Sequence, residues 1–292
     1  MKIGELRSLL SEHQLRLHKD LGQNFLVDEP RADELARLAG TEAGDTVIEI
    51  GTGLGALTRS LAQIADRVVS IEIDSGLVRV LRSEALLPDN VELIHADAMA
   101  VDLLELFQAA EAPVRVVANL PYSVATPILR RLLGLREHLV DWSVMVQREV
   151  GARMTAITGE RNYGSFAAIH AMTVTARNMM EIGSGCFYPA PRVRSSFLRI
   201  EPLSEPLLQD GELEDLERVV RAAFNQRRKM IGNSLRSAGF GPPAQLEALL
   251  RDAEISASDR PQEVDPGRWS TLARAMAQAG MLVVPSVTSP LR

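Results

Sequence analysis

Apolar residues in the first 200 positions form short, nearly continuous runs that alternate with segments of helical spacing. The runs are rich in valine and isoleucine, as in strands that are buried on both faces. They predict strands at residues 46–50, 67–74, 91–97, 114–118 and 142–146. Between them, apolar residues recur three or four positions apart, as in Leu57 and Leu61, which predicts amphipathic helices. The pattern therefore predicts successive strand–helix–strand units.

The pattern changes at residues 201–211, where two prolines and mixed polarity interrupt it. We place a domain boundary there. Beyond it, residues 213–235 predict a long helix with Leu216, Val220 and Phe224 on one side, and shorter helices are expected at residues 245–252 and 269–278. The sequence therefore predicts two domains, residues 1–204 and residues 205–292.

Three glycines, Gly51, Gly53 and Gly55, follow the first of these strands and precede a helical segment. Glycine permits backbone angles and close approaches that a side chain would forbid. A turn of this kind leaves backbone N–H groups free at a helix N-terminus, beside a bound ligand. A glycine-rich turn without a ligand is the alternative.

Acidic residues stand at the ends of the next two strands. Glu72 lies 21 residues after Gly51, a spacing that places a carboxylate beside the glycine turn, where it can accept both hydroxyl groups of a ribose. Asp97 ends the following strand, and it could accept a hydrogen bond from an adenine amino group or cap a helix. Together, these positions favour a nucleoside-binding cleft.

Composition narrows the class of protein. The chain has 292 residues, 46% of them hydrophobic, and a formal net charge of −6, which argues against nonspecific coating of nucleic acid. Its one cysteine excludes an internal disulfide and a multi-cysteine zinc site. Because no targeting segment or membrane span is apparent, we expect a globular cytoplasmic protein.

The segment Asn119-Leu120-Pro121-Tyr122 follows the fourth strand and carries the clearest chemical signal. The exocyclic amine of adenine is a poor nucleophile because its lone pair is delocalised into the ring. The Asn119 side-chain oxygen and the Leu120 carbonyl could accept its N–H bonds and favour a pyramidal, reactive nitrogen. Tyr122 could stack on a base that has left its own stack. An ordinary turn after a strand is the alternative.

Five motifs in this order and spacing resemble the small-subunit ribosomal RNA adenine dimethyltransferases: LGQNFL, EIGTGLGALT, IEID, HADAM and NLPY. Further on, CFYPAPRVRSSFLRI and AFNQRRKMIGNSL are similar to two more segments of that family. The resemblance implies an α/β fold, a Rossmann-like class I methyltransferase sheet that is mostly parallel. It also implies an antiparallel edge hairpin, here residues 179–182 and 195–200, and a small all-α C-terminal domain.

The same resemblance assigns roles to individual residues. It implies that S-adenosylmethionine binds against Asn24, Leu26, Gly51, Glu72, Asp97 and Asn119, and that S-adenosylhomocysteine is the product. The catalytic residues would be Asn119, Leu120, Tyr122 and Phe187, with Phe187 closing on the adenine face opposite Tyr122. Phe187 could instead be a core residue in a proline-rich turn. No metal is required.

The resemblance also implies a partner, the small-subunit (16S) rRNA within the immature 30S ribosomal subunit. It implies a monomeric enzyme that methylates N6 of two adjacent adenosines in that RNA. The basic cluster predicted to bind RNA phosphates comprises Arg221, Arg227, Arg228 and Lys229. A solubilising face is the alternative. The chain departs from the family pattern at Ala190, Arg194 and Gly232, and glycine in a helix costs about 1 kcal/mol relative to alanine.

Three other functions fit part of the pattern. A large-subunit (23S) rRNA adenine methyltransferase of the macrolide-resistance type shares the fold, but AFNQRRKMIGNSL favours the small-subunit branch. A nicotinamide oxidoreductase also combines a glycine turn with an acid, but it has no use for NLPY, and the glycines here follow G-x-G-x-G. An inactive assembly or transcription factor is disfavoured by the intact Asn119, Tyr122 and Phe187.

Overall fold

The computed structural model describes residues 3–15, 17, 23–120, 124–208, 211–226 and 228–282. Two of the predicted site residues, Tyr122 and Arg227, lie outside the described residues. The chain forms two compact units: residues 1–151 with 176–202, and residues 152–175 with 203–292. The first unit thus ends near the expected boundary at residue 204, whereas residues 152–175 belong to the second unit.

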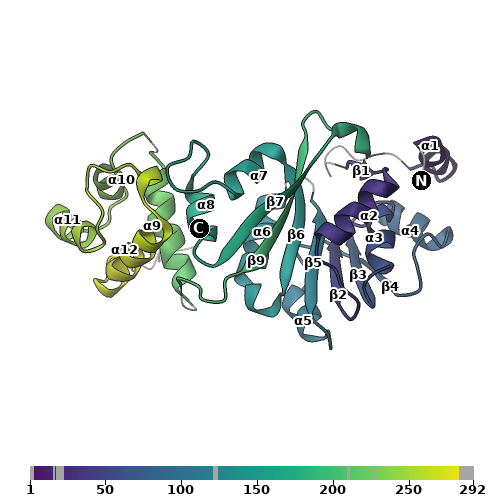
Figure 1. Ribbon diagram of the computed structural model, residues 1–292, viewed down its shortest axis with the longest axis horizontal. Coiled ribbons are helices and arrows are strands. Elements are labelled where there is room, and N and C mark those ends of the chain that lie inside the picture. The colour runs from purple at the N-terminus through teal and green to yellow at the C-terminus, as the bar shows by residue number, and fades with distance from the viewer. Residues whose placement is uncertain are drawn as a thin grey trace, which may run out of the picture. The chain divides into compact units, whose positions relative to one another are not determined.

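A seven-stranded sheet forms the centre of the first unit (Figure 1). Its strands are β2 (Thr46–Ile50), β3 (Arg67–Glu72), β4 (Val91–His95), β5 (Val114–Asn119), β6 (Asp141–Gln147), β7 (Val174–Ile182) and β9 (Ser195–Pro202). The spatial order is β4-β3-β2-β5-β6-β9-β7. The first five strands are parallel, and β9 runs antiparallel to β6 with Val144 opposite Leu198. The predicted fold class is confirmed.

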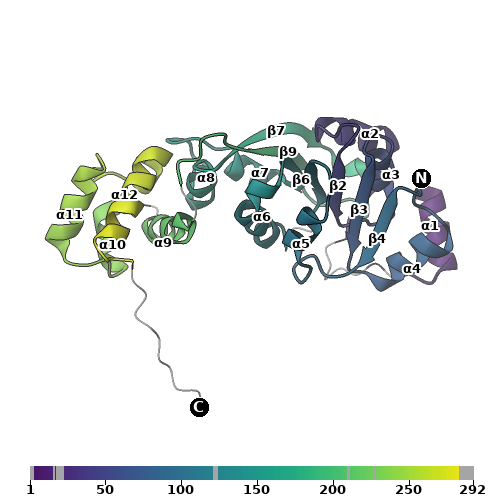
Figure 2. The same cartoon turned by 90° about the horizontal axis from the view of Figure 1, so that it is seen from below.

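Helices cover both faces of this sheet, as Figure 2 shows with α2 and α3 on one side and α5 and α6 on the other. The helices of the first unit are α1 (Ile3–Glu12), α2 (Glu29–Leu38), α3 (Ala56–Ala62), α4 (Ser75–Ser83), α5 (Leu103–Gln108) and α6 (Ala125–Gly134), and α7 (Arg148–Met154) follows β6. Val47 and Val117 pack with Leu61 of α3. The residue after Val47 on β2, Ile48, is also fully buried. Burial on both faces explains the continuous apolar runs.

The second unit is helical in the part of the chain that the structure describes after β9. It contains α8 (Ser165–His170), α9 (Glu212–Phe224), α10 (Ile231–Ser237), α11 (Pro243–Asp252) and α12 (Pro266–Gln278). The Trp269 ring centroid lies 5.9 Å from that of Phe224, and Tyr163 lies edge-on to Phe224 at 6.1 Å. The Tyr163 hydroxyl also donates to the Val264 carbonyl at 3.1 Å. These contacts hold residues 152–175 in this unit. Among the helices of the described ranges, none is both long and apolar enough to cross a membrane.

The predicted helix at residues 213–235 is wrong beyond Phe224. The helix α9 ends there, a turn follows, and α10 begins only at Ile231. Met230 is extended, and the Ile231 N–H donates to the Asp259 carbonyl at 2.8 Å rather than continuing the helix. The break coincides with the polar residues 225–229, and long-range hydrogen bonds hold the start of α10.

Close packing explains why glycine stands at position 232. Its N–H donates to the Ala257 carbonyl at 3.1 Å, and a Cβ atom at this position would lie 3.0 Å from both that oxygen and the Ala257 Cβ. Such contacts are tighter than van der Waals packing allows without a shift of the neighbour. The helix-propensity cost of glycine is therefore offset by close approach of the 257 backbone.

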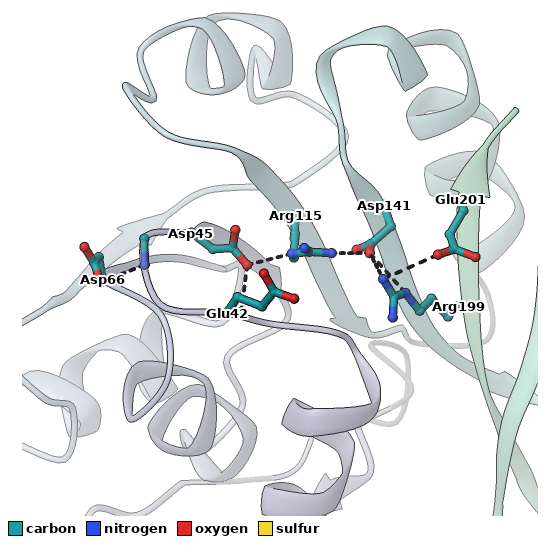
Figure 3. Close-up of polar contacts among 8 residues, drawn as sticks. Glu42, Asp45, Asp66, Arg115, Asp141, Arg199 and Glu201 are labelled. Carbon is teal, nitrogen blue, oxygen red and sulfur yellow. Dashed lines mark hydrogen bonds and ion pairs between the residues drawn. The ribbon is translucent and has the colours of Figure 1, made fainter. Parts of the chain in front are cut away.

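A buried ion network ties the amino-terminal ends of the parallel strands together (Figure 3). The Arg115 side chain on β5 donates to Asp45 at 2.6 Å and also to Asp141 at the start of β6. From β9, Arg199 donates to the same Asp141 oxygen at 2.6 and 3.0 Å. Burial raises the pKa of the Asp141 carboxyl, an effect that Arg115 and Arg199 only partly offset. The network joins β5, β6 and β9 at the end of the sheet opposite the glycine turn.

Candidate active site

A pocket opens at the carboxyl ends of β2, β3, β4 and β5, the position at which open α/β sheets bind ligands. All of its lining residues belong to the first unit. The pocket brings together seven of the predicted site residues: Asn24, Gly51, Glu72, Asp97, Asn119, Leu120 and Phe187. Leu26 does not line it, because its side chain is buried in the core behind the pocket, in the same cluster as Phe187.

The glycine turn forms the floor of the pocket. Gly51 has φ +90° and Gly53 has φ +57°, values in the left-handed region that favours glycine. A Cβ atom at Gly53 would lie 3.1 Å from the Phe25 ring, and one at Gly51 would lie 3.4 Å from the Asn119 carbonyl oxygen. The turn therefore permits close packing against two other walls of the same pocket.

Glu72 ends β3 and is fixed by two backbone donors. The Gly53 N–H donates to its Oε2 at 2.8 Å, and the Asp74 N–H donates to its Oε1 at 2.9 Å. Burial raises the pKa of Glu72, and the two N–H donors act against that rise. Each carboxylate oxygen can still accept another hydrogen bond. A carboxylate held this way is preorganised to accept two hydroxyl donors from a ligand.

Asp97 caps a turn rather than a helix, and it also lines the pocket. Its Oδ1 accepts the Met99 N–H at 2.8 Å, and its carbonyl accepts the N–H groups of Ala100 and Val101 at 2.8 and 3.0 Å. It thus caps a turn at residues 97–101, while Asp102 caps the helix α5 that follows. Because Asp97 also lines the pocket, capping does not remove it from the site.

Asn119 is the last residue of β5 and faces the first loop of the chain. Its side-chain nitrogen donates to the Asn24 carbonyl at 3.3 Å. This hydrogen bond orients the side chain so that its oxygen is the group available to accept from a ligand. Leu120 follows at once and is buried. The strand end therefore places an amide oxygen and the next backbone unit beside the glycine turn.

A two-stranded antiparallel ribbon forms the remaining wall. It pairs β1 (Phe25–Leu26) with β8 (Phe187–Tyr188), with Leu26 opposite Phe187. Phe187 is 3% exposed, packs in the core and also lines the pocket. The core interpretation of this residue is confirmed, and its place in the pocket lining leaves the stacking role on adenine a prediction.

Sequence reasoning missed several apolar residues of the lining. These are Phe25, Ile73, Leu77, Met99, Val124 and Ile128. In the sequence they are indistinguishable from ordinary core or surface apolar residues. What they share is a place in the pocket wall, which only the folded chain brings together.

A buried carboxylate, Glu49, lies directly beneath the glycine turn and was also missed. Its Oε2 accepts the hydroxyl groups of Thr58 on α3 and Ser70 on β3, both at 2.6 Å. The Ser70 hydroxyl is also 2.6 Å from that of Thr52 in the turn. Burial raises the pKa of Glu49 to about 7. The network links the turn to the helix and strand beside it.

Because the folded-state pKa of Glu49 exceeds its ordinary value of 4.5, the folded protein binds more protons than the unfolded chain between about pH 4.5 and 7. Its contribution to the free energy of unfolding is therefore present at low pH and is lost as pH rises through 7. We expect Glu49→Gln, which keeps one oxygen to accept both hydroxyls, to exceed the parent protein in stability by a few kcal/mol at pH 8. Urea unfolding at pH 5 and pH 8 measures this, with Glu92→Gln, an exposed position on β4, as control. A stability difference that does not grow with pH would contradict the prediction.

The predicted RNA-binding residues lie in the second unit. Arg221 is on α9 and pairs with the buried Glu217 at 3.4 Å. Arg228 and Lys229 are exposed, but they lie in the turn after α9 rather than on a continuous helix face. The basic cluster is therefore not a single helical stripe.

Known proteins are similar in sequence to this chain over nearly its full length. The model of the family described as ribosomal RNA adenine dimethylase matches residues 14–278. The ribosomal RNA small subunit methyltransferase A of Moorella thermoacetica is 38% identical over 280 residues, which cover 94% of this chain and 97% of that protein. The protein of the same name from Geobacter sulfurreducens is 34% identical and covers 91% and 97% of the two chains.

Two solved structures are similar as well. The 23S rRNA methyltransferase ErmE has a TM-score of 0.66 with 26% identity, covering 87% of this chain and 100% of its own. A dimethyladenosine transferase from Plasmodium falciparum has a TM-score of 0.75 with 20% identity, covering 88% and 98%, and so shares the fold. The extent of the family match and the identity to curated relatives leave one conclusion. The chain belongs to the ribosomal RNA adenine dimethylase family.

Proposed function

We propose that this protein transfers methyl groups from S-adenosylmethionine to N6 of two adjacent adenosines near the 3′ end of 16S rRNA, giving N6,N6-dimethyladenosine. The observation that carries the proposal is the convergence of Glu72, the glycine turn and Asn119-Leu120 on one pocket. The relatives at 34 and 38% identity are named as small-subunit methyltransferases, which favours this substrate over large-subunit rRNA.

The pocket fits S-adenosylmethionine on two grounds. Glu72 offers a buried carboxylate already oriented by Gly53 and Asp74, which suits two ribose hydroxyls. At Gly51 and Gly53 a Cβ atom would crowd Asn119 and Phe25, two other walls of the pocket, so the absence of side chains keeps the turn's backbone against the site. When bound, the cofactor supplies an electrophilic methyl group on a sulfonium. Glu72 and Asp97 would hold its nucleoside, and Gly51 and Asn24 would border its methionine part.

The chain's contribution to the chemistry is to position and polarise the target amine. With its nitrogen committed to Asn24, the Asn119 side chain accepts one N6–H bond through its oxygen, and the Leu120 carbonyl accepts the other. These acceptors favour the pyramidal nitrogen of the transition state over the planar ground state, which is how they accelerate transfer. Phe187 packs on the base, and Tyr122 is expected to stack on its other face.

The natural substrate in this proposal is the immature 30S subunit, and the enzyme acts as a cytoplasmic monomer that docks RNA phosphates through the basic cluster of the second unit. A radiolabelled methyl-transfer assay on unmethylated 30S and 50S subunits tests this. Two methyl groups on each of two adjacent 16S adenosines support the proposal. Transfer to 23S rRNA alone would establish the large-subunit alternative instead.

The carboxylate of Glu72 should govern cofactor affinity. We expect Glu72→Ala to weaken S-adenosylmethionine binding about 10- to 100-fold, because hydrogen bonds to a charged acceptor contribute about 1.5–3 kcal/mol. Isothermal titration calorimetry gives the dissociation constant, and circular dichroism checks that the variant is folded. Glu92→Ala removes an exposed carboxylate from the neighbouring strand β4 and serves as control. Unchanged affinity in Glu72→Ala would remove this residue from the cofactor site.

A further inference from the structure

We infer that Arg131 on α6 is a positioning residue that sets cofactor affinity by holding the turn at residues 97–101. The inference rests on the proposed function, because it assigns that turn to the nucleoside side of the cofactor. Arg131 is not itself one of the residues that line the pocket. It acts through the backbone of Asp97's turn.

The contacts are made to backbone carbonyls of the turn. Within the turn, the N–H groups of residues 99, 100 and 101 all point back to Asp97. Arg131 Nη1 donates to the Ala98 carbonyl at 2.7 Å, and Nη2 donates to the Val101 carbonyl. The planar guanidinium thus spans both ends of the turn with two donors in a fixed geometry. A lysine ammonium also has several donors, but they sit on one nitrogen and lack this fixed spacing.

This arrangement joins two walls of the pocket. The turn contributes Asp97, Ala98 and Met99 to the lining. The helix α6 contributes Ile128, one turn before Arg131 and on the same helix face, and Val124 lies just before its first residue. Because α6 follows the segment that begins at Asn119, Arg131 fixes the position of the cofactor-side turn relative to the helix behind the catalytic segment.

Calorimetric titration of the full chain with S-adenosylhomocysteine tests the inference. We expect Arg131→Gln to raise the dissociation constant about 10-fold, and Arg131→Lys to raise it by a smaller factor of about 3. The matched control is Arg130→Gln, which removes the adjacent guanidinium at an exposed position of the same helix and should leave affinity unchanged. Arg131→Lys also keeps the test decisive if the glutamine variant does not fold.

A double-mutant cycle with Asp97→Ala separates positioning from a general loss of stability. If Arg131 acts through Asp97's turn, Arg131→Gln should cost little further affinity once Asp97 is alanine, so the two effects are not additive. Fully additive losses, or equal losses from Arg130→Gln, would overturn the inference. If the parent protein itself fails to bind S-adenosylhomocysteine, the proposed function fails; if it binds and Arg131→Gln binds equally well, only the role of Arg131 fails.

Discussion

Asn119→Ala is expected to lower kcat for methyl transfer about 100- to 1,000-fold, the range found when one preorganised polar group of a reaction site is removed. Asn119 ends β5, and its side chain is oriented by a hydrogen bond to the Asn24 carbonyl. Alanine would remove the oxygen that accepts the target N–H but would leave the strand intact. The backbone pairing of β5 with β2 and β6 does not require the side chain.

Single-turnover methyl transfer with saturating S-adenosylmethionine and unmethylated 30S subunits measures the effect on chemistry apart from binding. The control is Asn178→Ala, which removes an exposed asparagine on β7 that hydrogen-bonds Glu181. Turnover that remains within a few-fold of the parent enzyme would refute the role given to Asn119.

Arg115→Met is expected to lower the free energy of unfolding by about 3–5 kcal/mol, because it leaves the buried carboxylates of Asp45 and Asp141 without their shared cation. Arg199 would still contact Asp141 but does not reach Asp45 in the network of Figure 3. Methionine keeps much of the side-chain length and packing. The loss of unfolding free energy therefore reflects the removed positive charge rather than a change in side-chain volume.

Urea denaturation of the parent protein and the variant measures the difference. Arg67→Met is the matched control, because it breaks an ion pair of the same type with Glu92 at a position where both side chains are about half exposed. Such exposed pairs contribute about 0–1 kcal/mol. Equal losses in the two variants would show that burial does not strengthen the dependence on Arg115.

The local features of the site could be predicted from the sequence because each depends on a few adjacent residues. A valine- and isoleucine-rich run must be buried on both faces, and a glycine such as Gly51 is needed where φ is positive. The parallel arrangement then brings the strand ends together, so that Glu72, Asp97 and Asn119 could be assigned to one cleft before their distances were known. The pocket confirms that these residues lie together.

Helix ends were less predictable. The apolar spacing of residues 165–174 suits one helix, but α8 ends at His170 and β7 begins at Val174. Adjacent β-branched residues at 173–175 favour the extended backbone, and pairing in the sheet stabilises it. In the second unit, the first residues of α10, Ile231 and Gly232, donate hydrogen bonds to the carbonyls of residues 259 and 257. Contacts between residues so far apart in the sequence cannot be predicted from the local spacing of apolar residues.

By itself, the sequence determined the parallel α/β framework, the glycine turn and the strand-end residues Glu72, Asp97 and Asn119. Only the tertiary structure decided that Phe187 pairs with Leu26, that Glu49 lies buried beneath the turn, and that Arg131 holds the turn of Asp97. The physical reason is the separation along the sequence of the residues that interact. Backbone propensity and side-chain periodicity act over a few residues, whereas these contacts form between segments that only the folded chain brings together.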